Sequence, residues 1–134
     1  MTYVLGQEQL DAIEEVLEED FTNIGVSCVF LIDMAGNVVA SQDSGKITHD
    51  IYSLAALAAG NFGAVSTMAK IIGEDEFSIL FHKGKKESIH FSKVMMDFLL
   101  ISIFDEKVSL GFLRLKVSDA VDKIATILDH QMKP

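Results

Sequence analysis

Residues 51–69 read IYSLAALAAGNFGAVSTMA and contain no charged side chain. The spacing of the apolar residues predicts a helix over 50–72, with Thr48 as its N-cap and Gly73 as its stop. A chain of 134 residues has too small an interior to bury such a helix on every side. We therefore expect a second molecule to cover part of it.

At 100° per residue the side chains of this helix fall into three arcs. The first arc is apolar and is expected to pack on a sheet; its members are Ile51, Leu54, Ala55, Ala58, Phe62, Val65, Ala69 and Ile72. The second arc is apolar with small residues at its middle, which suits close approach of another backbone; its members are Ser53, Leu57, Gly60, Ala64, Met68 and Ile71. The third arc is shallow and weakly polar; its members are Tyr52, Ala56, Ala59, Gly63, Thr67 and Lys70.

A membrane span is the alternative for this helix, because about 20 mostly apolar residues cross a bilayer. Polar and small residues such as Asn61 and Thr67 interrupt the run, and no basic cluster flanks it as a topology signal. The sequence therefore favours packing against protein.

The rest of the chain predicts an α+β domain that spans residues 1–134. Helical periodicity is present over 7–21 and again from residue 106 onward. Five apolar, β-rich runs predict strands over 26–32, 38–41, 77–82, 87–93 and 97–104. The order α-β-β-α-β-β-β-α with short strand connections predicts a five-stranded antiparallel sheet with one long central helix.

Charge is distributed unevenly along the chain, whose net charge is −9. Residues 1–45 contain nine carboxylates and no Lys or Arg, whereas the remainder is balanced. This distribution argues against nucleic acid as the main partner. The acidic first helix is interpreted as a solvated face, with steering of a basic partner as the alternative.

Targeting and redox features are sparse. The first basic residue is Lys46, so nothing before it resembles a secretory signal, and the single Cys28 lacks a disulfide partner. We expect a cytoplasmic protein.

Motifs for catalysis or cofactor binding are not evident. Gly84-Lys85-Lys86 lies in a predicted hairpin and cannot serve as a P-loop. Cys28 stands in an apolar run, where a buried thiol is usually inert. Asp97 and Asp105 bracket a strand and are expected to terminate it. We expect no cofactor and no enzymatic activity.

Two further groups are weaker candidates for functional residues. His82 and His90 could face each other across a hairpin, but two ligands make a weak metal site, so two ordinary strand histidines are preferred and no metal is expected. Arg114 is the only arginine and would be the sole choice for an arginine finger, yet it lies within a helix and is interpreted as a surface residue.

Three stretches carry a family resemblance: residues 69–82, AKIIGEDEFSILFH; residues 87–92, ESIHFS; and residues 103–117, IFDEKVSLGFLRLKV. With the element order above, the chain resembles the roadblock/dynein light chain family, in its bacterial MglB-like branch. The likeness covers nearly the whole chain and is weakest before Gly25 and after Ser118. These stretches are fold and packing signatures rather than catalytic motifs.

The resemblance implies a roadblock fold of the profilin/longin-like type and a homodimer in which both subunits share one sheet. It implies that a Ras-like small GTPase docks on the dimer, two subunits to one GTPase. It further implies stimulation of GTP hydrolysis, without an arginine finger, by ordering the switch regions of the GTPase in bacterial polarity and motility control. By this analogy the third arc binds the GTPase and the second arc forms the dimer interface, although the two assignments could be exchanged.

Two other functions stay open from the sequence. A dimeric adaptor of the roadblock type would bind its partner and leave hydrolysis unchanged. A ligand sensor of the related profilin-like or longin type would need a cavity within the monomer, which close packing of the sheet and central helix is expected to prevent.

Overall fold

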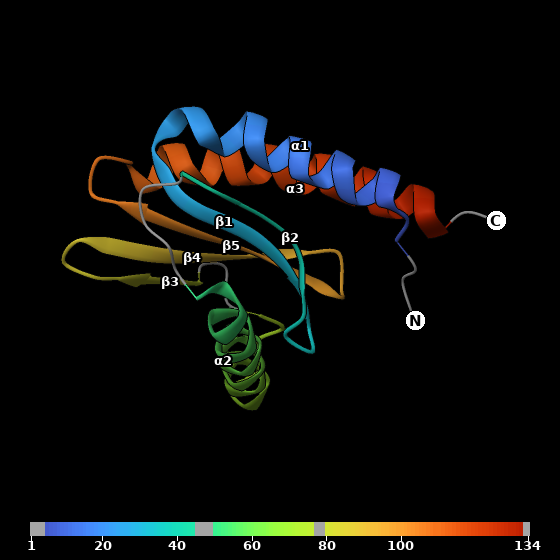
Figure 1. Ribbon diagram of the computed structural model, residues 1–134. Helices are drawn as coiled ribbons and strands as arrows, with labels where there is room; N and C mark the ends of the chain where they lie inside the picture. Colours follow the sequence, from blue (N-terminus) through green and yellow to red (C-terminus); the bar gives the residue numbers. More distant parts are fainter. Residues whose placement is uncertain (1–4, 45–49, 77–79, 133–134) are drawn as a thin grey trace.

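A computed structural model describes residues 5–44, 50–76 and 80–132 (Figure 1). The elements are α1 (Gln7–Phe21), the short 3-10 helix η1 (Thr22–Ile24), β1 (Val26–Asp33), β2 (Val38–Asp43), α2 (Ile51–Ile71), β3 (Leu80–Lys83), β4 (Glu87–Val94), β5 (Phe98–Asp105) and α3 (Leu110–Met132). The predicted α+β order is confirmed.

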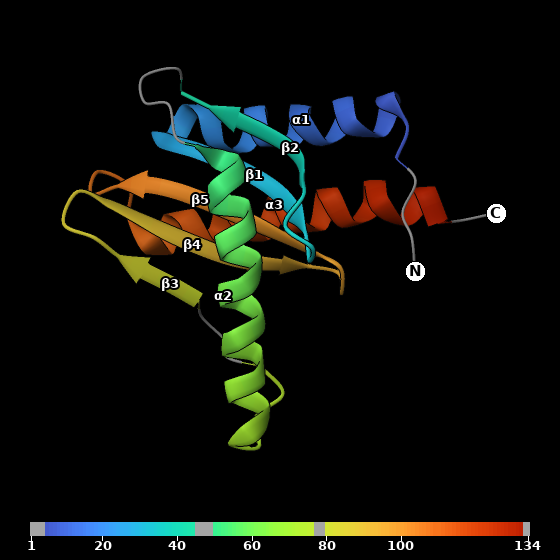
Figure 2. The ribbon, with the colours of Figure 1, turned by 60° about the horizontal axis from the view of Figure 1, so that its bottom comes forward.

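The sheet contains five antiparallel strands in the order β2-β1-β5-β4-β3. Helices α1 and α3 lie side by side on one face, and α2 crosses the opposite face (Figures 1 and 2). Because β1 and β5 are central and covered on both faces, they read as continuous apolar runs instead of alternating ones.

Two apolar cores flank the sheet. The larger lies under α1 and α3 and contains Phe21, Leu31, Leu100, Leu113 and Ile124 among its buried residues. The smaller lies under α2 and includes Phe30, Ile101 and Ile103 of the sheet. The α2 residues that are buried in this core are Ala55 and Ala58, and both have small side chains. The α2 face therefore has a thin cover.

Helix α1 has the bounds that its periodicity predicts. The expectation of a solvated acidic face does not hold for Asp20. This residue is buried and accepts a hydrogen bond from Lys123 Nζ of α3 at 3.0 Å. This ion pair ties the two helices of the outer layer together. The other α1 carboxylates are exposed.

The ends of α2 are set by local hydrogen bonds. Asp50 is the N-cap: its Oδ1 accepts from the backbone N–H of Ser53 at 3.1 Å, while Thr48, the predicted cap, lies outside the described residues. Gly73 ends the helix as predicted, with φ +88°, and its N–H donates to the Lys70 carbonyl at 3.1 Å.

Other boundaries differ from the prediction by one to four residues; β2, for example, runs to Asp43 instead of residue 41. Helix α3 begins at Leu110 instead of residue 106, because Ser109 Oγ accepts from the N–H of Phe112 at 3.2 Å as a cap. Asp105 ends β5, as expected, and its Oδ1 accepts from the N–H of Lys107 at 2.8 Å, which forms a turn before the helix. Residues 77–79 of the predicted third strand lie outside the described residues.

Candidate functional site

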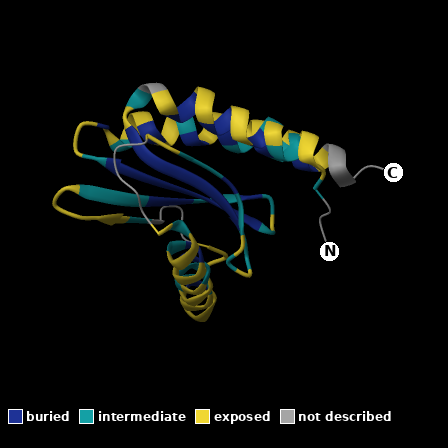
Figure 3. Cartoon of the chain, viewed as in Figure 1, coloured by how far each residue is buried: buried dark blue, intermediate teal, exposed yellow. Residues whose placement is uncertain are grey.

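Helix α2 is the most exposed apolar element among the described residues. It crosses the sheet, and its second half extends beyond the sheet (Figure 2). Its buried residues are only Ala55, Ala58 and Ala69. The first arc packs on the sheet as predicted in its first half, through Ile51, Leu54, Ala55, Ala58 and Phe62. Val65 and Ala69 do not belong to this core, and Ile72 is exposed near the helix end. Most of the remaining surface of α2 is open to solvent (Figure 3).

Large apolar side chains remain exposed along this helix. Tyr52, Leu57 and Ile71 are each more than 70% exposed, and Met68 is 53% exposed. A contiguous apolar surface on a folded domain marks an interaction site. Helix α2 is also the one described helix that is long and apolar enough to cross a membrane by length and composition.

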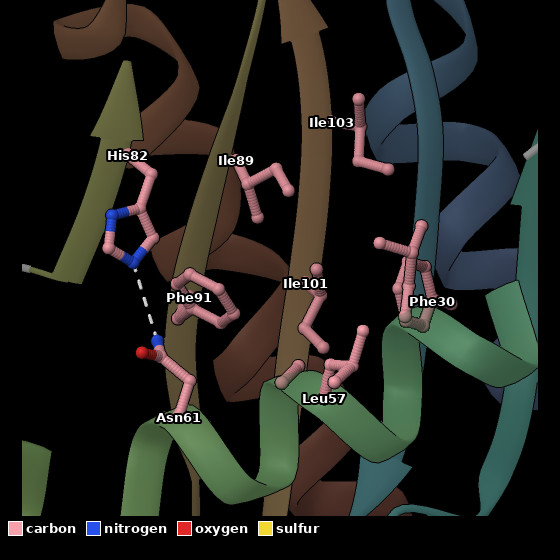
Figure 4. Close-up of a pocket in the computed structure, with 10 residues that line it drawn as sticks. Phe30, Leu57, Asn61, His82, Ile89, Phe91, Ile101 and Ile103 are labelled. Atoms are coloured by element: carbon pink, nitrogen blue, oxygen red, sulfur yellow. Dashed lines mark hydrogen bonds between the residues drawn. The ribbon is translucent and has the colours of Figure 1, made fainter. Parts of the chain in front are cut away.

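The second arc borders an apolar pocket of about 140 Å³ between α2 and the β3 side of the sheet (Figure 4). Close packing was expected here, and the prediction is wrong because Ala58 is too small to fill the space above the sheet. Phe30, Ile101 and Ile103 form part of the apolar lining, and Leu57 lies on the α2 side.

One polar contact closes the β3 side of this pocket. The Asn61 side-chain amide lies 3.3 Å from His82 Nε2, at hydrogen-bonding distance, and links α2 to β3 (Figure 4). The ring of His82 also packs edge-on against Phe91, with ring centroids 5.7 Å apart. A largely apolar hollow with a single polar pair at one side suits an inserted apolar side chain.

The third arc borders the turn between β1 and β2. A Cβ built on Gly36 of this turn would lie 3.0 Å from Ala56 Cα, so the turn packs directly on the helix backbone. Ala59 is partly buried against the α2-face core, whereas Tyr52, Ala56, Gly63, Thr67 and Lys70 are exposed.

Two glycines allow another chain to approach α2 closely. A Cβ built on Gly60 of the second arc or on Gly63 of the third would meet nothing within 4 Å. Their positions would therefore let a neighbouring backbone approach the helix axis closely. Both outer arcs of α2 are available for contact with other chains.

The histidines do not form a site together. In the β3–β4 ladder Phe81 pairs with His90 and His82 pairs with Ile89. Neighbouring residues of a strand point to opposite faces, so His82 lies on the α2 face and His90 on the α3 face. The suggestion that they could face each other is wrong because the actual register is offset by one residue from that arrangement. No group of three or more potential metal ligands occurs among the described residues.

The two remaining candidates are placed as the sequence indicates. Cys28 is buried, and burial, followed by the charges of Asp43 and Glu87, raises its pKa to about 11. The thiol therefore stays protonated and is a poor nucleophile.

Arg114 is exposed on α3, in the layer across the sheet from α2. Its place there does not suit a finger directed at a partner bound on α2.

Comparisons with known proteins identify relatives of this chain in sequence and fold. The Roadblock/LC7 domain profile matches residues 12–104. An uncharacterised protein of Methanocaldococcus jannaschii is 30% identical over 115 residues, which cover 84% of this chain and 96% of the relative.

Two solved structures are similar over almost their full length. Myxococcus xanthus MglB has a TM-score of 0.88 and 34% sequence identity, covering 98% of each chain. The gliding protein MglB of Thermus thermophilus has a TM-score of 0.87 and 30% identity, covering 96% of this chain and 97% of its own.

Proposed function

The chain belongs to the Roadblock/LC7 family and is MglB-like, and we propose that it regulates a Ras-like small GTPase as a cytoplasmic homodimer. The observation that carries the proposal is α2 itself: a helix with three buried residues and two open outer arcs needs partners on both sides. A second copy supplies one partner and the GTPase the other.

The second arc is the better candidate for the dimer interface. It holds the exposed Leu57, Met68 and Ile71 and borders the apolar pocket, so pairing here would remove the most apolar surface from water. A two-fold axis beside this arc would let each copy place a side chain into the pocket of the other. Such an axis would bring the two β3 edges together and extend one sheet through both subunits.

The third arc is then the GTPase surface. It lies on the side of α2 where the β1–β2 turn packs, away from the pocket. Small side chains such as Ala56 and Gly63 would let a switch segment lie flat against the helix. One GTPase bound beside the two-fold axis would block the equivalent surface on the other copy, which gives two subunits to one GTPase.

Stimulation of GTP hydrolysis would come from ordering the GTPase's own residues. The only arginine of this chain, Arg114, lies in the α3 layer across the sheet, so it offers no finger to a partner on α2. Immobilising a switch segment lowers the entropy cost of aligning water and catalytic groups. In this account the protein contributes no catalytic group, and its cellular role is control of polarity and motility.

Phosphate release under single-turnover conditions tests the proposal. The GTPase should be a Ras-like protein encoded beside this chain's gene, loaded with GTP and mixed with this protein or buffer. Acceleration that saturates at two subunits per GTPase is the expected result. Binding with an unchanged rate would identify a dimeric adaptor, and absence of binding would overturn both functions.

A further inference from the structure

A polar cavity of about 310 Å³ lies between β4 and α3. Its polar lining consists of Glu76, which precedes β3, of His90, Ser92 and Lys93 from β4, and of Arg114, Ser118 and Asp122 from α3; Phe62 of α2 also lines it. Among the described residues, β3 pairs with β4 only between Ser88 and Phe91, so the cavity opens where that ladder ends. No part of the proposed GTPase regulation uses these side chains.

His90 is the buried polar group of this cavity. Its side chain is 6% exposed, and its Nδ1 has no hydrogen-bond partner among the described residues. A buried polar atom without a partner costs about 1–3 kcal/mol, a cost that a bound water or ligand would offset. Ser102 pairs with His90 across the β4–β5 ladder and lies on the same face of the sheet. Its Oγ is a second buried polar atom without a hydrogen-bond partner among the described residues.

Arg114 makes the His90 end of the cavity electropositive. Burial, followed by the charge of Arg114, lowers the pKa of His90 to about 4, so the imidazole is neutral at physiological pH. Arg114 makes no hydrogen bond or ion pair with any described residue. A guanidinium that no described residue engages, beside a neutral ring with an N–H to donate, is suited to an oxyanion.

The two carboxylates of the cavity do not neutralise Arg114 at the His90 end. Glu76 is engaged by Lys93, with Nζ and Oε2 3.4 Å apart. Asp122 lies two helical turns beyond Arg114 on α3, about 12 Å along the axis, so it does not neutralise the guanidinium. The titratable side chains that face His90's cavity are therefore Glu76, Lys93, Arg114 and Asp122.

We propose that this cavity binds a small molecule through a carboxylate or phosphate group. The fork of Arg114 holds two oxygens of the group, and His90 donates from its ring. Ser92 and Ser118 line the same cavity and supply further hydroxyl donors. The apolar side chains of Val117 and Val121 leave room for a short apolar portion of the ligand.

Nuclear magnetic resonance of the His90 ring in the full chain tests this site, with inorganic phosphate and acetate as separate probes at constant ionic strength. The expected result is a saturating shift of the His90 signals with at least one probe. Arg114→Met should weaken that binding roughly tenfold to a hundredfold, and Arg114→Lys should weaken it less. Lys116→Met removes a positive charge from the same helix outside the cavity and should leave binding unchanged.

The two probes distinguish a phosphate ligand from a carboxylate ligand. A linear, non-saturating response, or an equal loss in Arg114→Met and Lys116→Met, would overturn the site. Because Arg114 is exposed on the helix and methionine is a good helix former, the variant should fold, and its circular dichroism checks this. The outcome is independent of phosphate release by the GTPase, so the two proposals fail or succeed separately.

Discussion

Gly36 and Ala56 touch through their backbones: a Cβ at Gly36 would lie 3.0 Å from Ala56 Cα. Gly36 also has φ +90°, in the left-handed region that glycine favours. The tip of the β1–β2 turn is thereby fixed against the third arc of α2. Any partner that lies on this arc also meets the turn.

Gly36→Ala should lower the free energy of unfolding by about 2–3 kcal/mol, because it combines backbone strain with a steric clash against α2. Gly73→Ala is the matched control, since Gly73 has φ +88° but an added Cβ there meets nothing within 4 Å. The control should cost only about 1 kcal/mol. Urea denaturation of both variants measures the difference, and equal losses would show that the contact with Ala56 is unimportant.

Substitutions on the two outer arcs of α2 should separate dimerisation from GTPase stimulation. Leu57→Arg, on the second arc, should yield a folded monomer, because Leu57 is 71% exposed within one subunit and borders the pocket assigned to the partner copy.

Gly63→Arg, on the third arc, should preserve the dimer and abolish stimulated phosphate release. Ala59→Arg should also abolish stimulation, but Ala59 contacts the core and this variant should lose stability as well.

Sedimentation velocity and phosphate release on the same samples provide the readout. If Gly63→Arg is monomeric and Leu57→Arg remains dimeric, the two arcs are exchanged. Stimulation unchanged in both Gly63→Arg and Ala59→Arg would remove the third arc from the GTPase surface.

Acidification should destabilise the protein through His90. Its folded pKa, about 4, is below the ordinary value of 6.5, so the unfolded chain binds the proton more readily. This contribution to stability is complete above pH 6.5 and is lost as pH falls toward 4. Wild type should therefore lose more stability than His90→Gln across this range in parallel denaturation series, and parallel curves would contradict the assignment.

Cys28 should resist alkylation in the folded protein. Burial raises its pKa to about 11, so almost no thiolate exists near neutral pH. Iodoacetamide should label Cys28 only after denaturant is added, as followed by mass spectrometry. Rapid labelling of the native protein would show that β1 is accessible.

Local sequence signals predict much of the fold because they act within a few residues. The apolar period of α1 fixes its bounds, and Gly73 ends α2 because the last turn requires a left-handed residue. The start of α3 is less predictable, since Asp105 and Ser109 compete with helix formation through side-chain bonds to the backbone. Asp50 caps α2 by the same kind of bond.

Features that depend on register or on tertiary packing are not predictable from such signals. The placement of His82 and His90 on opposite faces follows from a one-residue offset in the β3–β4 ladder. The burial of Asp20 depends on Lys123, which is distant in sequence. The three arcs of α2 follow from helical geometry, but the pocket beside Leu57 depends on how α2 crosses the sheet.

Pairing of two copies of this chain through α2 underlies both the dimer interface and the GTPase surface. Light scattering coupled to size-exclusion chromatography, at micromolar protein concentration, measures the mass of the assembly. Wild type should have twice the chain mass of 14.7 kDa, and folded Leu57→Arg should have the single-chain mass. A stable, folded wild-type monomer at that concentration would show that the two copies do not pair.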